Sequence, residues 1–179
     1  INFVIMKNAL IPILGFAAPS GTGKTTLLTQ LIPQLKAHKI RVGLIKHSHH
    51  NFQIDKPGKD SFRLREAGAT PVMLVSSHRR AMITEFDTPQ APSLDEQLHY
   101  FDQSNLDLIL VEGFKREHFP KIELHRPSLG EACLYPEDNC IIAIASDQAM
   151  QLKRKIVSID LNNIPQIADF IVHTFLQQS

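Results

Sequence analysis

The sequence is short of cysteine, long apolar runs and signal-like segments, and each shortage removes a class of protein. Only Cys133 and Cys140 are present and they lack C-x-x-C spacing, so we interpret them as ordinary thiols of a reducing cytosol. No stretch reaches the roughly 18 apolar residues of a membrane-spanning helix. The opening segment has neither a charged start nor an A-x-A cleavage site. We expect a cytoplasmic protein with no membrane partner.

Net charge is also nearly absent. The chain has 19 Lys and Arg against 18 Asp and Glu, a formal net charge of +1. This balance argues against broad electrostatic capture of nucleic acid, although a local basic patch stays open. There are no repeats or low-complexity tracts. With 179 residues, 43% of them hydrophobic, we expect one domain over residues 1–179, with residues 1–10 as an extension outside its core.

Short apolar runs alternate with segments of helical spacing. Strands are expected at residues 11–17, 41–47, 71–77, 81–86, 106–113, 121–126, 140–146 and 155–160. Helices are expected at residues 25–38, 60–69, 94–101 and 164–175. The apolar run at residues 11–17 indicates a strand buried on both faces, and residues 41–47 are expected to form a second buried strand. The pattern predicts an α/β fold with a mostly parallel sheet flanked by helices on both faces.

Three positions qualify these helices. Pro33 should kink or shorten the first one. Asp60 and Ser93 stand where helices begin and are candidate N-caps, while Gly68 is a stop signal.

The segment "APSGTGKT" (residues 18–25) follows an expected strand and opens an expected helix. It fits the phosphate-loop pattern G-x-x-x-x-G-K-[ST], except that Ala18 replaces the first glycine. Glycines let backbone N–H groups turn toward one anion, the lysine reaches β and γ oxygens, and the Thr25 hydroxyl binds Mg²⁺. The expected phosphate ligands are Ser20, Gly21, Thr22, Gly23, Lys24, Thr25 and Thr26.

A phosphate loop needs a carboxylate near Mg²⁺, usually at the end of a neighbouring strand. Glu112 follows the apolar run "LILV" and meets this requirement. Asp55 and Asp60, in the segment after the second strand, are further candidates for Mg²⁺, and for Asp60 a helix cap is the alternative. We take Lys24, Glu112 and Asp60 as candidate catalytic residues.

Other polar side chains are expected at the same sheet edge. His47, His49 and His50 form the cluster "KHSHH"; contact with an anionic ligand or a partner is favoured over a metal site. Gly113 and Lys115 follow Glu112, and Lys115 with Arg116 could bind a second phosphate or form a solvated charge run. Asp147 ends another strand and could accept the N1–H and N2–H₂ groups of guanine, or could cap a turn.

Taken together, "GTGKTTLL", "GLIKHSHH", "DKPGKDSFRLREAGA", "LDLILVEGFK" and "IAIASD" resemble the MobB family of adapter proteins in molybdopterin-guanine dinucleotide biosynthesis. The segments run in order over nearly the whole chain.

The resemblance implies a P-loop NTPase fold, a homodimer, binding of GTP with Mg²⁺ and weak hydrolysis. It also implies partnership with the molybdenum cofactor guanylyltransferase, which joins GMP to molybdopterin, and makes molybdopterin a candidate ligand. Residues 21–26 match the family's phosphate loop and Glu112-Gly113 its acidic strand end. The role of Asp147 stays open.

Two other functions compete. A nickel-insertion GTPase would use the histidines for metal, but the sequence shows no cysteine–histidine metal motif. A small-molecule kinase would need an arginine-rich lid and a catalytic acid. Slow turnover is expected because no arginine lies in the phosphate loop; Arg63, Arg65 or Arg116 are candidates to supply that charge.

Overall fold

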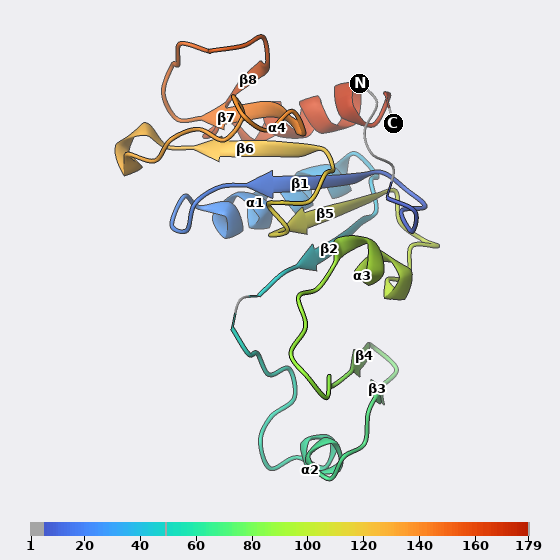
Figure 1. Ribbon diagram of the computed structural model, residues 1–179. Coiled ribbons are helices and arrows are strands. Elements are labelled where there is room, and N and C mark those ends of the chain that lie inside the picture. The colour runs from blue at the N-terminus through green and yellow to red at the C-terminus, as the bar shows by residue number, and fades with distance from the viewer. Residues whose placement is uncertain (1–5, 49, 179) are drawn as a thin grey trace. The chain divides into compact units, whose positions relative to one another are not determined.

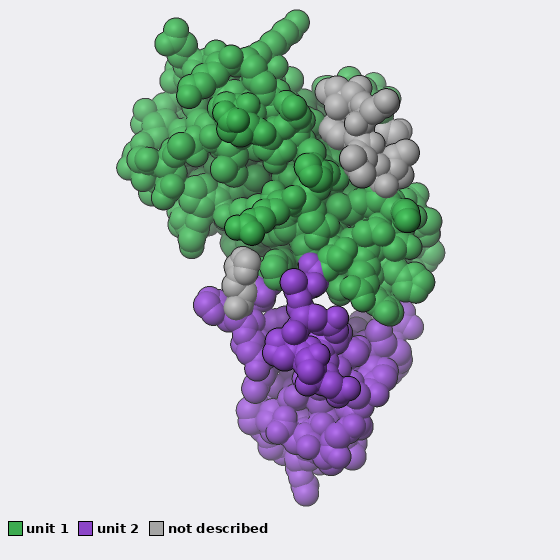
Figure 2. All heavy atoms as spheres, viewed as in Figure 1, with its two compact units in different colours: residues 1–47, 93–179 green, residues 48–92 purple. Residues whose placement is uncertain are grey.

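The structure is a computed structural model that describes residues 6–48 and 50–178. It divides into two compact units (Figure 2). The sheet unit comprises residues 1–47 and 93–179, and the inserted unit comprises residues 48–92. The division into two compact units does not test the expectation of one domain over residues 1–179, which stays a prediction.

The sheet unit is built on six parallel strands in the order β2-β5-β1-β6-β7-β8 (Figure 1). Their bounds are β1 Ile13–Ala17, β2 Val42–Lys46, β5 Leu108–Glu112, β6 Lys121–His125, β7 Ile141–Ser146 and β8 Val157–Asp160. Because all six run the same way, their carboxyl ends meet at one edge. The predicted parallel α/β sheet is confirmed.

Helices cover both faces of this sheet. On one face lie α1 (Lys24–Ala37) and α4 (Ile164–Phe170), which continues as a π-helical turn (Ile171–Phe175). They form one buried cluster with side chains of β1, β5, β6, β7 and β8. On the other face lies α3 (Leu94–Tyr100). A 3₁₀ turn (Pro127–Leu129) follows β6. No helix in residues 6–48 and 50–178 combines the length and apolar character needed to cross a bilayer.

Three local expectations need correction. The strand at β2 is not buried on both faces, because strand order places it at the sheet edge, where Leu44 is exposed. Pro33 does not shorten α1, which runs on to Ala37; the alternative, a kink at Pro33, stays a prediction. Ser93 stands at the N-cap of α3 as expected, but its side chain is not the partner of the first helical N–H. The Leu94 N–H donates instead to Glu117 Oε1 (2.8 Å).

The inserted unit holds α2 (Asp60–Glu66) and an antiparallel pair, β3 (Val72–Val75) and β4 (Arg80–Ile83). The expected strands at 71–77 and 81–86 therefore exist, but as a separate two-stranded sheet outside the parallel one. Lys59, not Asp60, is the N-cap of α2, and Asp60 lies in its first turn. The stop at Gly68 is confirmed: its φ is +103° and its N–H donates to the Arg65 carbonyl.

Candidate nucleotide-binding site

The phosphate loop occupies residues 18–23, between the end of β1 and the start of α1. Gly21 (φ +81°) and Gly23 (φ +99°, the N-cap of α1) adopt left-handed conformations that favour glycine. The Thr22 hydroxyl donates to the Pro19 carbonyl (3.0 Å) and fixes the turn. The first backbone N–H groups of a 14-residue helix, at Lys24 and beyond, follow directly. This arrangement is suited to an anion.

Lys24 closes over its own loop. Its ammonium donates to the carbonyls of Ala18 and Pro19, both at 2.9 Å. An ammonium carries three N–H donors, so these two bonds leave capacity for a ligand oxygen. The predicted phosphate-loop residues thus lie together, with Thr25 and Thr26 in the first turn of α1.

The end of β5 brings a carboxylate to this loop. Glu112, 13% exposed, pairs with Lys46 (3.1 Å), its register partner on β2. Burial and the charge of Lys115 lower the pKa of Lys24; Glu112 acts in the opposite direction, and Lys46 lowers it again. Lys24 thus lies within electrostatic range of two further lysines and one carboxylate, a local excess of positive charge that an anionic ligand would balance.

The adjoining residues fix the strand ends to one another. Gly113 has φ +100°, and a Cβ there would lie 2.7 Å from the His47 Cβ, so only glycine lets the two strand ends approach this closely. The His47 N–H donates to the Glu112 carbonyl (2.8 Å), and its ring stacks on Phe114 with centroids 4.9 Å apart. The predicted neighbours His47, Glu112 and Gly113 are brought together.

On the other side of the loop, Arg126 reaches two partners that the sequence left unconnected. Its Nε donates to the Thr22 carbonyl (3.0 Å) and its Nη1 to Asp147 Oδ2 (2.6 Å). Asp147 lies at the end of β7 and lines a pocket of about 390 Å³. Sequence reasoning missed Arg126. The available signal was its place directly after the strand "KIELH".

The remaining predicted ligands belong to the inserted unit. The Asp55 carboxylate is paired with Arg65 (3.2 Å). Arg65 also binds Glu85, so this arginine is already engaged within its own unit. The backbone of His50 hydrogen-bonds the Ser48 hydroxyl. His49 lies outside the described residues. The Mg²⁺ role of Asp55 and Asp60 stays a prediction.

A histidine and a cysteine lie close together in the structure, although no sequence motif predicts this. Glu123, His125 and Cys133 place one ligand atom each within 4.8 Å of one another. Both Glu123 oxygens, however, accept backbone N–H bonds, from Leu134 (2.7 Å) and Tyr135 (2.8 Å). Burial raises the pKa of the Cys133 thiol. These contacts account for the cluster as an anchor for the segment after β6.

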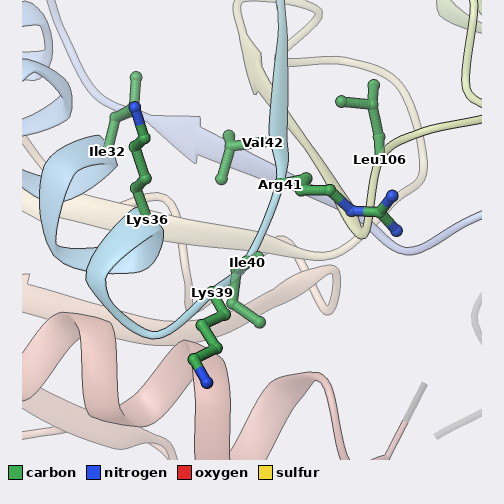
Figure 3. A pocket seen from close by; sticks show the side chains of 7 residues that line it. All are labelled: Ile32, Lys36, Lys39, Ile40, Arg41, Val42 and Leu106. Carbon is green, nitrogen blue, oxygen red and sulfur yellow. The ribbon is translucent and has the colours of Figure 1, made fainter.

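A second pocket, of about 370 Å³, lies at the far end of α1 (Figure 3). Lys36 and Lys39 border it, and Arg41 donates to both Asp107 oxygens (2.9 and 2.7 Å). Lys24 and Lys36 are separated by about 18 Å at 1.5 Å per helical residue. The described lining residues include none of the predicted phosphate ligands.

Comparison with known sequences settles the family. A family model described as "Molybdopterin guanine dinucleotide synthesis protein B" (MobB) matches residues 13–147. The chain belongs to the MobB family. This MobB-family chain is 50% identical over 169 residues to the molybdopterin-guanine dinucleotide biosynthesis adapter protein of Haemophilus influenzae (94% of this chain, 92% of that one). It is 48% identical over 176 residues to the adapter protein of that description from Escherichia coli (95% and 97%).

Solved structures agree on the fold. A crystal structure of molybdopterin-guanine biosynthesis protein B matches with a TM-score of 0.67 at 24% identity, over 92% of this chain and 99% of that one. Bacillus subtilis MobB matches with a TM-score of 0.72 at 21% identity, over 91% and 97%. The predicted P-loop NTPase-like fold and the resemblance to MobB are confirmed, and the chain is a MobB adapter of molybdopterin guanine dinucleotide biosynthesis.

Proposed function

We propose that this chain is a GTP-binding adapter that positions GTP while a partner, the molybdenum cofactor guanylyltransferase, attaches GMP to molybdopterin. One observation carries the nucleotide part of the proposal. The Lys24 ammonium lies on the phosphate loop, within electrostatic range of Lys46, Lys115 and the Glu112 carboxylate, and Glu112 itself pairs with Lys46. Such a cationic cluster at a helix N-terminus is suited to a polyphosphate.

The donor set is also compatible with Mg²⁺. Thr25 offers a hydroxyl in the first turn of α1 and Glu112 a mostly buried carboxylate; hard oxygen ligands of this kind suit magnesium. The ion would then replace Lys46 as the positive charge that balances Glu112. Bound Mg²⁺ would neutralise phosphate charge.

Guanine selectivity is assigned to Asp147. A carboxylate at the carboxyl end of β7, beside a polar pocket, can accept the N1–H and N2–H₂ pair that guanine offers and adenine does not. We propose slow hydrolysis in addition. Of the three candidate arginines, Arg65 is already bonded to carboxylates. Arg63 and Arg116 stay candidates, and turnover without an arginine at the phosphates lacks an acceleration of about 10³–10⁵.

We further propose a homodimer formed through the inserted unit. Described apolar side chains there are exposed, among them Met73 (53%), Val75 (71%) and Phe86 (59%). Met73 and Val75 are two residues apart on β3 and so share one face of it. Exposed apolar side chains of this kind mark an interaction site, and a second copy would bury them symmetrically. We place the adapter in the cytoplasm, to which the free thiols of Cys133 and Cys140 are suited.

Calorimetry with GTP and ATP, each with Mg²⁺, tests the proposal on the wild type and on Lys24→Ala. We expect GTP to bind far more tightly than ATP and the variant to lose most of that affinity, because charge-assisted bonds contribute about 1.5–3 kcal/mol each. Lys36→Ala is the matched control: it removes the same charge from the opposite end of α1. Titration with molybdopterin tests the pterin as a second ligand.

Each contrary result points elsewhere. ATP binding equal to that of GTP would overturn the guanine assignment and favour the kinase; product analysis with a panel of acceptors would then identify its substrate. Tight Ni²⁺ binding in equilibrium dialysis would favour the nickel-insertion GTPase. Equal losses in Lys24→Ala and Lys36→Ala would show that the phosphate loop is not the site.

A further inference from the structure

Arg126 stands between the two halves of the proposed nucleotide site. The strand order β1-β6-β7 places the residue after β6 between the loop after β1 and the carboxylate after β7. One guanidinium bonds both: Nε to the Thr22 carbonyl (3.0 Å) and Nη1 to Asp147 (2.6 Å). Because the guanidinium is planar and rigid, it holds these two acceptors at a fixed separation.

The Asp147 carboxylate is only half satisfied by this contact. Arg126 occupies Oδ2, while Oδ1 is buried and accepts no hydrogen bond from the described residues. A buried oxygen without a donor is costly, so it marks a place where a donor is missing. The N1–H and N2–H₂ groups of guanine are donors of the required kind.

The surroundings of Asp147 are suited to a base and its sugar. The pocket that Asp147 lines also presents Ser146, Ser158, Asn162 and Gln166. These side chains combine donors and acceptors, as recognition of a nucleoside requires.

We infer that Arg126 is a positioning residue that links guanine recognition at Asp147 to the phosphate loop at Thr22. The inference rests on the proposed binding of GTP. Arg126 acts through its two partners: it orients the carboxylate for the base and holds the loop for the phosphates. Base and triphosphate are then bound as one unit, and loss of the link weakens discrimination between bases as well as affinity.

The experiment compares GTP, ITP and ATP on the wild type, Arg126→Ala and Arg126→Lys. ITP lacks the 2-amino group of guanine but keeps N1–H, so the GTP-to-ITP affinity ratio reports the contact of that amino group, which the proposal assigns to Asp147. We expect Arg126→Ala to reduce this ratio by about tenfold, the worth of one charge-assisted bond. Arg126→Lys should restore little of the GTP-to-ITP ratio, because an ammonium cannot reproduce the fixed pair of N–H donors of a guanidinium. A purely structural role would lower all three affinities equally and leave the ratio unchanged.

Arg154→Ala is the matched control. Arg154 donates to the carbonyls of Tyr135, Asp138 and Ile141, so its removal breaks a comparable set of bonds in the same unit, away from the phosphate loop. We expect its nucleotide ratios to equal those of the wild type. A second readout is the double variant with Asp147→Asn, in which removal of Arg126 should change the ratio no further.

The outcomes separate the inference from the proposed function. If the wild type prefers GTP and Arg126→Ala keeps that preference, or binds GTP more tightly, the link is refuted and the proposed function stands. Losses in the GTP-to-ITP affinity ratio that are additive in the double variant also refute the link. If the wild type does not distinguish GTP from ATP, the guanine assignment and the inference both fail.

Discussion

The two units of the chain are stabilised in opposite ways. The sheet unit buries apolar side chains from both faces of its strands: Leu14 and Leu110 on one face and Ile109 on the other are each 0% exposed. In the inserted unit none of the described residues, 48 and 50–92, is fully buried. Its contacts centre on Arg65, which pairs with Asp55 and Glu85 and lies over the Phe62 ring at 5.0 Å.

This difference assigns ligand binding to the sheet unit and association with a partner to the inserted unit. The predicted phosphate ligands stand on the unit with its own core, which keeps them in fixed positions. A segment of about 45 residues cannot build a sufficient core by itself, and its apolar side chains remain available to a partner. Four measurements test this difference between the two units.

Leu110→Ala should have the largest effect. Leu110 is fully buried on β5 in the middle of the sheet, and truncation of such a leucine costs about 2–5 kcal/mol of unfolding free energy. Leu64→Ala, at a 61% exposed position of α2, should cost less than about 0.5 kcal/mol. Urea unfolding followed by circular dichroism compares the two. Similar losses would contradict the contrast between the units.

Arg65→Ala should affect the inserted unit alone. Its loss leaves the Asp55 side chain, only 4% exposed, without its cation. We expect proteolytic cleavage within residues 48–92 to rise by about tenfold, since a buried charge without a partner is costly. The midpoint of sheet unfolding should not move. Arg63→Ala, on the same helix, is the control. A matching fall in sheet stability would show that the units do not unfold separately.

Val75→Lys tests the exposed surface of the inserted unit. Val75 is 71% exposed on β3, and a charge there should dissociate the proposed dimer while changing the unfolding free energy by less than about 0.5 kcal/mol. Sedimentation equilibrium measures the assembly. Leu10→Lys places the same charge at a 79% exposed position of the sheet unit and should leave the dimer intact. A dimer that survives Val75→Lys argues against this interface.

The smallest effect concerns pH. Hydrogen bonds from Arg41 lower the pKa of Asp107 from 3.8 to about 2. A depressed pKa contributes stability above the ordinary value of the group, and this contribution is lost as the pH falls from 3.8 toward 2. Thermal melts over this range should show a small, salt-sensitive loss. Asp107→Asn should abolish this pH-dependent loss of stability. If the dependence of melting temperature on pH is the same in the variant, the Arg41–Asp107 pair contributes nothing to stability.

The parts of the site that could be predicted depend on local sequence. The phosphate loop is continuous, and Glu112 and Asp147 each end an apolar run, so the strand-end rule found them. The strand-end rule also covers Arg126, which directly follows β6, but its partner could not be found in this way, because the contact with Thr22 spans 104 positions. It depends on β6 lying beside β1, and strand order leaves no local pattern. The edge position of β2 was missed for the same reason.

The inserted unit shows a second limit. Residues 72–75 and 80–83 have the apolar, β-branched character of strands, and strands they are. Their composition does not say which sheet they join. For α2, Asp60 is a better capping residue than Lys59, yet the helix begins one residue earlier than the capping preference suggests.

The position of β1 bears on how the protein is made. β1 pairs with β5 and β6, whose residues begin at Leu108 and Lys121. A ribosome therefore delivers the phosphate loop about a hundred residues before either strand that flanks it. Long-range parallel pairing is slow to form, and chains emerge at about 5–20 residues per second. The loop is thus among the first parts of the chain to be synthesised and among the last to acquire its shape.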